Sequence, residues 1–269
     1  MANTDTVFAG SIPALYDRHL GALLFAPYAD DAARRLADLE AGTLIETAAG
    51  TGIVTQTLAT RLPPSVEILA TDLNQAMLDF AAAKPGLERV SFRQADALAL
   101  PVADSSFDAL VCQFGVMFFP DRVKGYREAY RVLKPRGRAL IAIWDGLEHN
   151  PIARVTVEAM ARLFPADPPR FLARTPHGHG DRKVIRDELA QAGFRDVTID
   201  TVTLPSRGTP RDPAIGFCQG SPMRAEIEAR DAAGLQKATD AVEAAVTAAF
   251  GSGKIEAPMQ ALVVTATKD

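Results

Sequence analysis

The sequence predicts an α/β fold in which helices cover a doubly wound, mostly parallel sheet. From about residue 43 to residue 144, short apolar runs alternate with segments of helical periodicity. Most of these runs are apolar nearly throughout, as expected of strands that are covered on both faces. Regular alternation of strands with helices is typical of a parallel sheet with crossover helices. The runs expected to form strands are 43–47, 66–72, 90–96, 107–113 and 137–144.

The helices expected between these strands are 52–61, 74–84 and 121–133. Before them, an amphipathic pattern in residues 27–42 predicts a helix that ends at Gly42. After residue 144 the pattern loosens, with helical segments at 151–164, 183–192 and 222–250 and strands at 194–204 and 257–268. The two late strands bring the expected sheet to seven strands.

This pattern divides the chain into four parts. Residues 1–42 are expected to form a helical cap, and residues 43–204 the core of the fold. The core carries a lid segment near 151–181, because its Pro- and Gly-rich part, 164–181, is expected to be a long loop and long loops in compact domains often act as lids. Residues 205–256 are expected to be a helical insertion, either a second part of the lid or the interface of a homodimer. Residues 257–269 complete the sheet.

Charge and cysteine usage exclude several classes of protein. The chain has 29 basic and 33 acidic residues, a net charge of −4, so no overall field attracts nucleic acid or an anionic membrane. Only Cys112 and Cys218 are present, and disulfides are not expected. The sequence shows no export signal and no apolar run long enough to span a membrane, which favours a cytoplasmic location. No cluster of His, Cys and acidic residues predicts a metal site.

A patch of small residues follows the first predicted strand. Residues 48–52 read "AAGTG", where a buried strand turns into a helix. Small residues let a ligand approach the backbone, and the amides of a helix start favour electron-rich groups, although tight strand-helix packing selects the same residues. Asp72 ends the second strand, 20 residues after Gly52, where a carboxylate accepts hydrogen bonds from ribose hydroxyls or caps the next helix. Asp96 ends the third strand, beside Ala97, and is placed to address an adenine edge or to cap a turn.

Two cofactor classes fit this layout, and the turn discriminates between them. A dinucleotide-binding turn has three spaced glycines, whereas Gly50 and Gly52 are here followed by Thr55. The acidic Glu46 precedes the small residues and would repel a pyrophosphate, but it suits a cationic amino or sulfonium group. The turn therefore favours S-adenosylmethionine over a nicotinamide cofactor.

Four segments in order and one later segment carry a family resemblance. They are "LIETAAGTG", "ILATDLNQAML", "VSFRQADALALPVADSSFDALVCQFGVMFFPD", "LKPRGRALIAIW" and, at 189–199, "LAQAGFRDVTI". With these segments the chain resembles a class I S-adenosylmethionine-dependent methyltransferase, of the branch that includes the ubiquinone/menaquinone-biosynthesis type and many small-molecule methyltransferases. The resemblance implies a Rossmann-like methyltransferase fold, with S-adenosylhomocysteine as the product of the cofactor.

The resemblance also implies a role for each matching residue. The methionine part of the cofactor would be surrounded by Glu46, Ala48, Ala49, Gly50, Thr51 and Gly52. Asp72 would hold the ribose, and the adenine would be contacted by Leu73, Met77, Asp96 and Ala97. Gln113 and Phe114 would line the floor where the methyl donor meets the acceptor. The family often has glycine at position 48, so we expect Ala48 to keep a negative φ.

The acceptor is expected to be a small molecule. Methyltransferases that act on nucleobase amino groups usually have a motif similar to Asp/Asn-Pro-Pro-Tyr/Phe after the fourth strand, and the turn "QFGVMFF" of this chain lacks it. The apolar residues of this turn fit either an acceptor wall or the core. His177 and His179 are candidates for a catalytic base, and Tyr16 and Tyr28 for closing over the donor. Two alternatives are a nicotinamide-dependent oxidoreductase and a non-catalytic S-adenosylmethionine-binding protein. The atom that is methylated does not follow from the sequence.

Overall fold

A seven-stranded sheet forms the centre of the molecule in the computed structural model, which describes residue 5 and residues 10–269. The strand order is β3-β2-β1-β4-β5-β7-β6. The first five strands pair in parallel, and β7 is antiparallel to both β5 and β6. The predicted doubly wound, mostly parallel sheet is therefore confirmed. The strands are β1 (Gly42–Glu46), β2 (Val66–Asp72), β3 (Val90–Gln94), β4 (Phe107–Gln113), β5 (Leu133–Trp144), β6 (Asp196–Gly208) and β7 (Ile255–Thr267).

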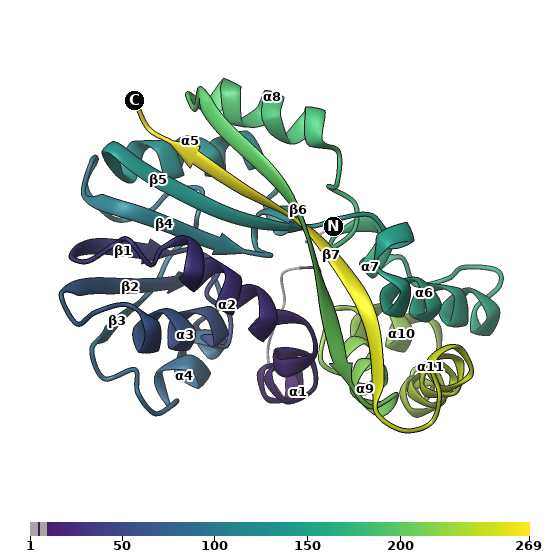
Figure 1. Cartoon of the computed structure of the whole chain (residues 1–269). Coiled ribbons are helices and arrows are strands. Elements are labelled where there is room, and N and C mark those ends of the chain that lie inside the picture. The colour runs from purple at the N-terminus through teal and green to yellow at the C-terminus, as the bar shows by residue number, and fades with distance from the viewer. Residues whose placement is uncertain (1–4, 6–9) are drawn as a thin grey trace.

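Helices cover both faces of this sheet (Figure 1). One layer contains α2 (Ala26–Arg35), α3 (Ile53–Arg61) and α4 (Gln75–Ala82), and the other contains α5 (Arg122–Val132) and α8 (Arg182–Ala192). Aspartate side chains begin two of them, since Asp121 accepts from the amide of Lys124 and Asp181 from that of Lys183. Because both faces are covered, strand residues such as Leu44 and Ile45 are fully buried, which explains their apolar runs.

The hairpin of β6 and β7 extends beyond the rest of the sheet. The two strands pair from Asp196 with Thr267 to Gly208 with Ile255, whereas β5 reaches only as far as Ala261 of β7. Figure 1 shows the free half of this hairpin running into a second group of helices. They are α6 (Pro151–Leu163), α7 (Phe171–Arg174), α9 (Arg211–Cys218), α10 (Met223–Arg230) and α11 (Leu235–Phe250), with α1 (Ile12–Leu20) beside them.

Two predicted helices differ from the structure, and one helical turn was not predicted. The helix expected over 27–42 ends at Arg35, and Gly42 instead begins β1 at a φ of 124°, where a Cβ would collide with the Asp108 carboxylate. A π-helical turn, η2 (Gly21–Phe25), joins α1 to α2. The helix expected over 222–250 is broken between α10 and α11, because Asp231 is extended and its carboxylate bonds the amide of Ala233.

Two further segments were not predicted as helices. Helix α9 lies between β6 and α10, and the short α7 lies inside the Pro- and Gly-rich segment that was expected to be a loop. In the described part of the chain, no helix combines the length and the apolar character needed to cross a membrane. No group of three or more potential metal ligands occurs among the described residues either.

Candidate cofactor and acceptor site

Two cavities meet where the strands of the parallel sheet end. The strand-end cavity, about 790 Å³ when counted to its open mouth, follows the carboxyl ends of β1 to β4. The apolar cavity, about 700 Å³ counted in the same way, lies between the sheet, α1 and the second group of helices. Tyr16, Phe114 and Phe118 line both cavities, so the two spaces share one wall.

The strand-end cavity collects most of the residues that were predicted to bind a cofactor. Those lining it are Tyr16, Ala48, Gly50, Asp72, Leu73, Met77, Asp96, Ala97, Gln113 and Phe114. Sequence reasoning did not assign Asn74, Ala95, Leu98, Gly115 and Pro120 to the site, although they also line the cavity. Phe118 and Phe119, from the turn that was expected to form either an acceptor wall or the core, line it as well. Asn74, Ala95, Leu98 and Gly115 are each adjacent in the sequence to a predicted residue. Proximity to a strand end could have indicated them.

The two glycines of the turn have different functions. Gly52 begins α3 with a φ of 79°, and a Cβ there would lie 2.8 Å from Cβ of Ala81 on α4. Gly50 has a φ of 56°, and a Cβ there would meet no described atom within 4 Å. Gly52 is therefore required by packing between helices, whereas Gly50 faces the cavity.

Ala48 adopts a backbone conformation that the sequence analysis did not expect. Its φ is +54°, not negative, which costs an L-residue about 1–2 kcal/mol. Its methyl group lies over Gly115, where a Cβ would collide with the Ala48 methyl and lie 2.9 Å from Sγ of Cys112. The expectation for φ was wrong. The alanine is accommodated because residue 115 has no side chain.

Asp72 is held by the backbone at the edge of the strand-end cavity. Its Oδ2 accepts a hydrogen bond from the amide of Gly50 at 2.8 Å, and its Oδ1 accepts from the amide of Asn74 at 2.8 Å. Asn74, not Asp72, occupies the N-cap position of α4. Burial raises the pKa of the Asp72 carboxyl, while these two amides oppose the shift. Oδ1 also accepts from the side-chain amide of Asn74 at 3.5 Å, whereas Oδ2 keeps a further lone pair for a ligand hydroxyl.

Glu46 lies outside the strand-end cavity, contrary to the prediction that it surrounds the methionine part. Its Oε2 accepts from the hydroxyl of Thr55 on α3 at 2.6 Å, and the residue is only 2% exposed. Burial raises the pKa of Glu46 to about 8, so the carboxyl is mainly protonated at neutral pH. The side chain is directed between β1 and α3 because it ends a strand that is covered on both faces. Among the residues predicted to contact the cofactor, Ala49, Thr51 and Gly52 are also absent from the described cavity lining.

Gln113, which lines the strand-end cavity, has a side-chain oxygen without a hydrogen-bond partner among the described residues. Its Nε2 donates to the carbonyl of Phe25 at 3.1 Å. Oε1 is buried and has no hydrogen-bond partner among the described residues. A buried acceptor without a partner costs free energy until a donor reaches it. This atom therefore fits a ligand that brings an N–H or O–H group.

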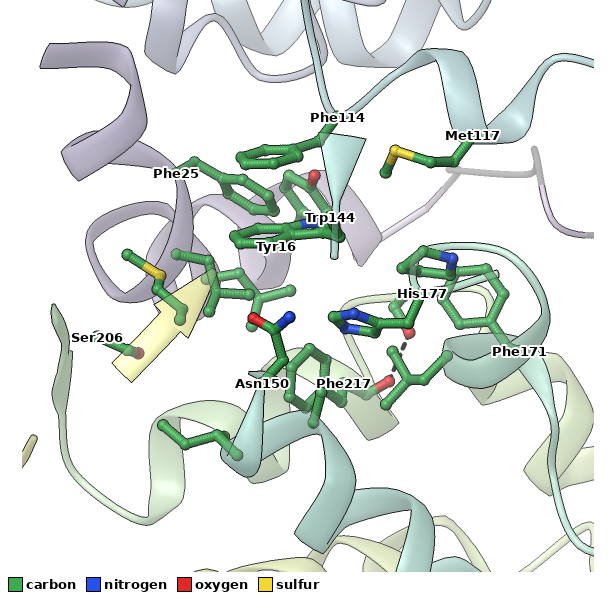
Figure 2. Close-up of a pocket in the computed structure, with 18 of the residues that line it drawn as sticks. Tyr16, Phe25, Phe114, Met117, Trp144, Asn150, Phe171, His177, Ser206 and Phe217 are labelled. Atoms are coloured by element: carbon green, nitrogen blue, oxygen red, sulfur yellow. Dashed lines mark hydrogen bonds between the residues drawn. The ribbon is translucent and has the colours of Figure 1, made fainter. Parts of the chain in front are cut away.

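Aromatic rings form the wall of the apolar cavity (Figure 2). The rings of Phe114 and Trp144 stack in parallel with centroids 3.7 Å apart, and Phe25 lies tilted against both. Tyr16 stacks on Phe25 at 4.9 Å. Phe217, from α9, lines the opposite side. Such a cavity favours an apolar, ring-bearing ligand over a strongly charged one.

The two candidate tyrosines have different positions. Tyr16 lies on the wall shared by the two cavities, as the prediction for the donor site requires. Tyr28 lines neither of them, and its hydroxyl donates to the carbonyls of Val202 at 3.0 Å and Met259 at 2.9 Å. Tyr28 therefore ties α2 to the β6–β7 hairpin, and it was wrongly placed over the donor.

The two candidate histidines are also separated. His177 lines the apolar cavity, with Nδ1 2.8 Å from the carbonyl oxygen of Asp145. His179 lines neither cavity, and its Nε2 lies 3.2 Å from Glu188 on α8. Burial lowers the pKa of His179 to about 4. Only His177 is placed to act on a ligand in the apolar cavity.

Comparisons with known proteins agree with this geometry. A family model described as a methyltransferase domain matches residues 45–141. The demethylmenaquinone methyltransferase of Lactobacillus johnsonii is 33% identical over 168 residues, which cover 58% of this chain and 68% of that protein. The ubiquinone/menaquinone biosynthesis C-methyltransferase UbiE of Yersinia pestis is 29% identical over 173 residues, covering 60% and 69%.

A solved structure shows the same fold. Phosphoethanolamine N-methyltransferase 2 of Haemonchus contortus, in complex with S-adenosyl-L-methionine, superposes with a TM-score of 0.60 at 18% identity. The match covers 95% of this chain and 56% of that one. The sheet order, the small-residue turn and the acid at the end of β2 define a class I S-adenosylmethionine-dependent methyltransferase.

The chain belongs to this family, in the branch of the ubiquinone and menaquinone biosynthesis methyltransferases. It is a methyltransferase that uses S-adenosylmethionine and acts on a small molecule, as the sequence predicts. The nicotinamide-dependent and non-catalytic alternatives are therefore set aside.

Proposed function

We propose that the strand-end cavity holds S-adenosylmethionine and that the apolar cavity holds an acceptor with an aromatic or similarly apolar body. The observation that carries this proposal is the wall shared by the two cavities at Tyr16, Phe114 and Phe118. A methyl donor in the strand-end cavity and an acceptor in the apolar cavity would meet where the two cavities adjoin, beside these three side chains. In-line alignment is the main requirement of the reaction, and orientation of this kind contributes up to about 7–11 kcal/mol in well-oriented systems.

The residues of the strand-end cavity fit the proposed cofactor. The remaining lone pair on Oδ2 of Asp72 suits a ribose hydroxyl, and Leu73 and Met77 offer apolar contact to an adenine. Asp96, whose Oδ1 accepts from the amide of Leu98 at 2.9 Å, and Ala97 lie beyond them toward β3. The unpartnered Oε1 of Gln113 suits a donor on the methionine part. The bound cofactor supplies a methyl group that its sulfonium already activates.

The second group of helices supports the lid that was predicted for the site. Phe171 and Leu172 of α7 and Phe217 of α9 line the apolar cavity, so these helices cover part of it, as a lid over the site would. Among the described residues of α10 and α11, none lines it. The apolar stripe of α11 is fully buried at Val242 and Val246, and the helix packs against α6 and α9 of the same chain. This stripe is therefore used within the chain, and the homodimer stays a prediction.

The apolar cavity and the related proteins support the same class of acceptor. A cavity roofed by helices suits a small molecule better than a nucleic acid or a folded protein. By their names, the related enzymes act on demethylmenaquinone or in ubiquinone and menaquinone biosynthesis. We infer that an apolar, ring-bearing molecule is the acceptor here as well.

Binding and turnover together test this proposal. Calorimetry is expected to show binding of S-adenosylhomocysteine and none of NAD. Release of S-adenosylhomocysteine is then measured against a panel of phenols, hydroquinones, aromatic amines and carboxylic acids. Turnover is expected with ring-bearing members of the panel. NAD binding without S-adenosylhomocysteine binding, or turnover restricted to open-chain acids, would contradict the proposal.

The variant Phe217→Leu is expected to raise the KM for the acceptor without changing the dissociation constant of S-adenosylhomocysteine. Phe217 lines only the apolar cavity, and an aromatic contact contributes about 0.5–1.5 kcal/mol, which corresponds to roughly twofold to tenfold in KM. Phe250→Leu, at the end of α11 and away from both cavities, is the matched control. An equal change of KM in both variants would mean that α9 does not contact the acceptor.

A further inference from the structure

Phe114 has a strained backbone conformation at the place where the two cavities adjoin. Its φ is +56°, in the left-handed region that a bulky side chain rarely adopts. A second strained residue lies beside it, since Ala48, at a φ of +54°, packs its methyl group against Gly115 of the same turn. Strained residues of this kind cluster at sites that bind ligands. The conformation of Phe114 is therefore typical of a turn that faces a ligand.

Strand β5 holds both the backbone and the ring of Phe114. The amide of Phe114 donates to the carbonyl of Ala142 at 2.9 Å. Its ring stacks on that of Trp144, the last residue of β5, with the centroids 3.7 Å apart and the planes 1° apart. These two attachments fix the strained residue, and they use one face of its ring within the protein.

The other rings of the cluster lie beside this stack and not over it. The centroid of Tyr28 is 5.2 Å from that of Phe114 and 5.4 Å from that of Trp144. For Phe25 the two distances are 6.0 Å and 6.4 Å. A ring over the outer face of Phe114 would be much farther from Trp144 than from Phe114. The face of Phe114 opposite Trp144 is therefore not covered by another ring among the described residues.

This outer face of Phe114 is available to the strand-end cavity. Phe114 lines both cavities, whereas Trp144 lines only the apolar one. In Figure 2 the ring of Trp144 lies between Phe114 and His177, on the side of the apolar cavity. Because Trp144 covers the face of Phe114 on that side, the face that remains open is the one on the side of the strand-end cavity.

The carboxylates of the strand-end cavity lie at its other end. Asp72 ends β2 and Asp96 follows β3, and both strands are on the far side of β1 from β4. Glu46 lies outside the cavity, bonded to Thr55. Among the described lining residues of both cavities, Asp72 and Asp96 are the two acidic ones. A cation at the β4 end of the cavity therefore has no carboxylate beside it among these residues.

We propose that the outer face of Phe114 contacts the sulfonium of S-adenosylmethionine, and that this cation–π contact distinguishes the methyl donor from its neutral product, S-adenosylhomocysteine. The inference rests on the proposed function, because it needs the cofactor in the strand-end cavity. With the ribose at Asp72 and the adenine toward β3, the methionine part extends across β1 toward β4. The sulfur has to lie where the cavities adjoin, because its methyl group must reach the acceptor. Phe114 lies at this place.

An aromatic face suits this particular cation. A sulfonium has no N–H or O–H group, so hydrogen-bond acceptors replace its hydration shell poorly, whereas the electron-rich face of a ring attracts any cation. Loss of the methyl group leaves the sulfur neutral and removes this attraction. The ring therefore favours the donor over the product. A contact of this kind corresponds to about twofold to thirtyfold in affinity.

Calorimetry on the protein without an acceptor tests the proposal. In Phe114→Leu, the dissociation constant of S-adenosylmethionine is expected to rise about twofold to thirtyfold more than that of S-adenosylhomocysteine. Sinefungin, which has a charged amine in place of the sulfonium, is expected to follow S-adenosylmethionine. If Phe114 only packs against Trp144, all three ligands will weaken by the same factor.

Phe25→Leu is the matched control. It removes a ring from the same cluster, but Phe25 lines only the apolar cavity. The ratio of the dissociation constants of S-adenosylmethionine and S-adenosylhomocysteine is expected to stay that of the parent protein. An equal shift of this ratio in Phe25→Leu and Phe114→Leu would overturn the specific role of Phe114.

A second set of variants keeps the shape of the ring. Phe114 is replaced by phenylalanines with one, two or three ring fluorines, which withdraw electron density from the ring face. The ratio of the two dissociation constants is expected to shift toward S-adenosylhomocysteine with each added fluorine. A ratio that is independent of fluorination contradicts the proposal. This series decides the question by itself if Phe114→Leu does not fold.

The outcomes also separate this inference from the function on which it rests. If both forms of the cofactor bind and their ratio does not depend on the ring at position 114, the inference fails and the cofactor site stands. If neither S-adenosylmethionine nor S-adenosylhomocysteine binds the parent protein, the proposed function and this inference both fail.

Discussion

Replacing Asp72 by alanine is expected to weaken binding of S-adenosylhomocysteine about tenfold to a hundredfold for each ribose hydrogen bond that is lost. Hydrogen bonds to a charged group contribute about 1.5–3 kcal/mol, and about 1.4 kcal/mol corresponds to a factor of ten. The carboxylate is oriented by the amides of Gly50 and Asn74, and Oδ2, which accepts only from Gly50 among the described residues, keeps a lone pair for the ligand. Isothermal titration calorimetry measures the change.

The control for this variant is Asp79→Ala. Asp79 lies on α4, is exposed, and bonds only to the side chain of Gln75 among the described residues. The Asp79→Ala variant loses the same charge near the site but leaves the cavity lining intact. Its affinity for S-adenosylhomocysteine is therefore expected to match that of the parent protein. A folded Asp72→Ala protein with an unchanged dissociation constant would mean that Asp72 only holds the turn together.

Replacing Gly52 by alanine is expected to destabilise the protein by about 2–5 kcal/mol in total. A positive φ costs an L-residue about 1–2 kcal/mol, and forcing a methyl group into a packed site costs about 1–3 kcal/mol more. The new Cβ would lie 2.8 Å from Cβ and 3.4 Å from Cα of Ala81, and α4 would have to move. The free energy of unfolding, measured in urea, reports the loss.

The variant Gly50→Ala makes the comparison specific. Its φ of 56° carries the same backbone cost of about 1–2 kcal/mol, but its methyl group would enter the strand-end cavity without a collision. It is expected to lose less stability than Gly52→Ala and to bind S-adenosylhomocysteine more weakly than the parent. Equal destabilisation by the two substitutions would contradict the different functions assigned to the two glycines.

Local patterns were sufficient for the sheet and for most of the cofactor cavity. Strands β2 and β4 were predicted with the bounds that the structure shows, because an apolar run that ends in a polar residue marks the edge of a buried strand. Strand β2 ends at Asp72, β4 ends at Gln113, and Asp96 follows β3. Because these strands are parallel, the three residues lie at one edge of the sheet. The sequence pattern alone therefore predicts that these three residues line one cavity.

Helix boundaries outside the sheet were less predictable. The segment 27–42 kept an amphipathic pattern after Arg35, where the chain leaves the helix to reach β1. The position at which a helix stops depends on where its neighbour in space begins, and a periodic pattern does not record that position. The same reason explains why α9 was missed, since it is short and packs against α1 and α11.

By itself the sequence determined the fold class, the cofactor and the group of residues at the strand ends. The fold class and the strand-end residues follow from the order of local patterns along the chain. The cofactor follows from the family resemblance, since Glu46, which also favoured that cofactor, lies outside the cavity. Only the tertiary structure separated His177 from His179 and Tyr16 from Tyr28, and turned Glu46 away from the cavity. Two residues of the same type in one segment, such as two histidines, cannot be assigned different roles from the sequence pattern. Their side chains acquire different roles only when distant elements pack beside them, such as β5 behind His177 and the β6–β7 hairpin above Tyr28.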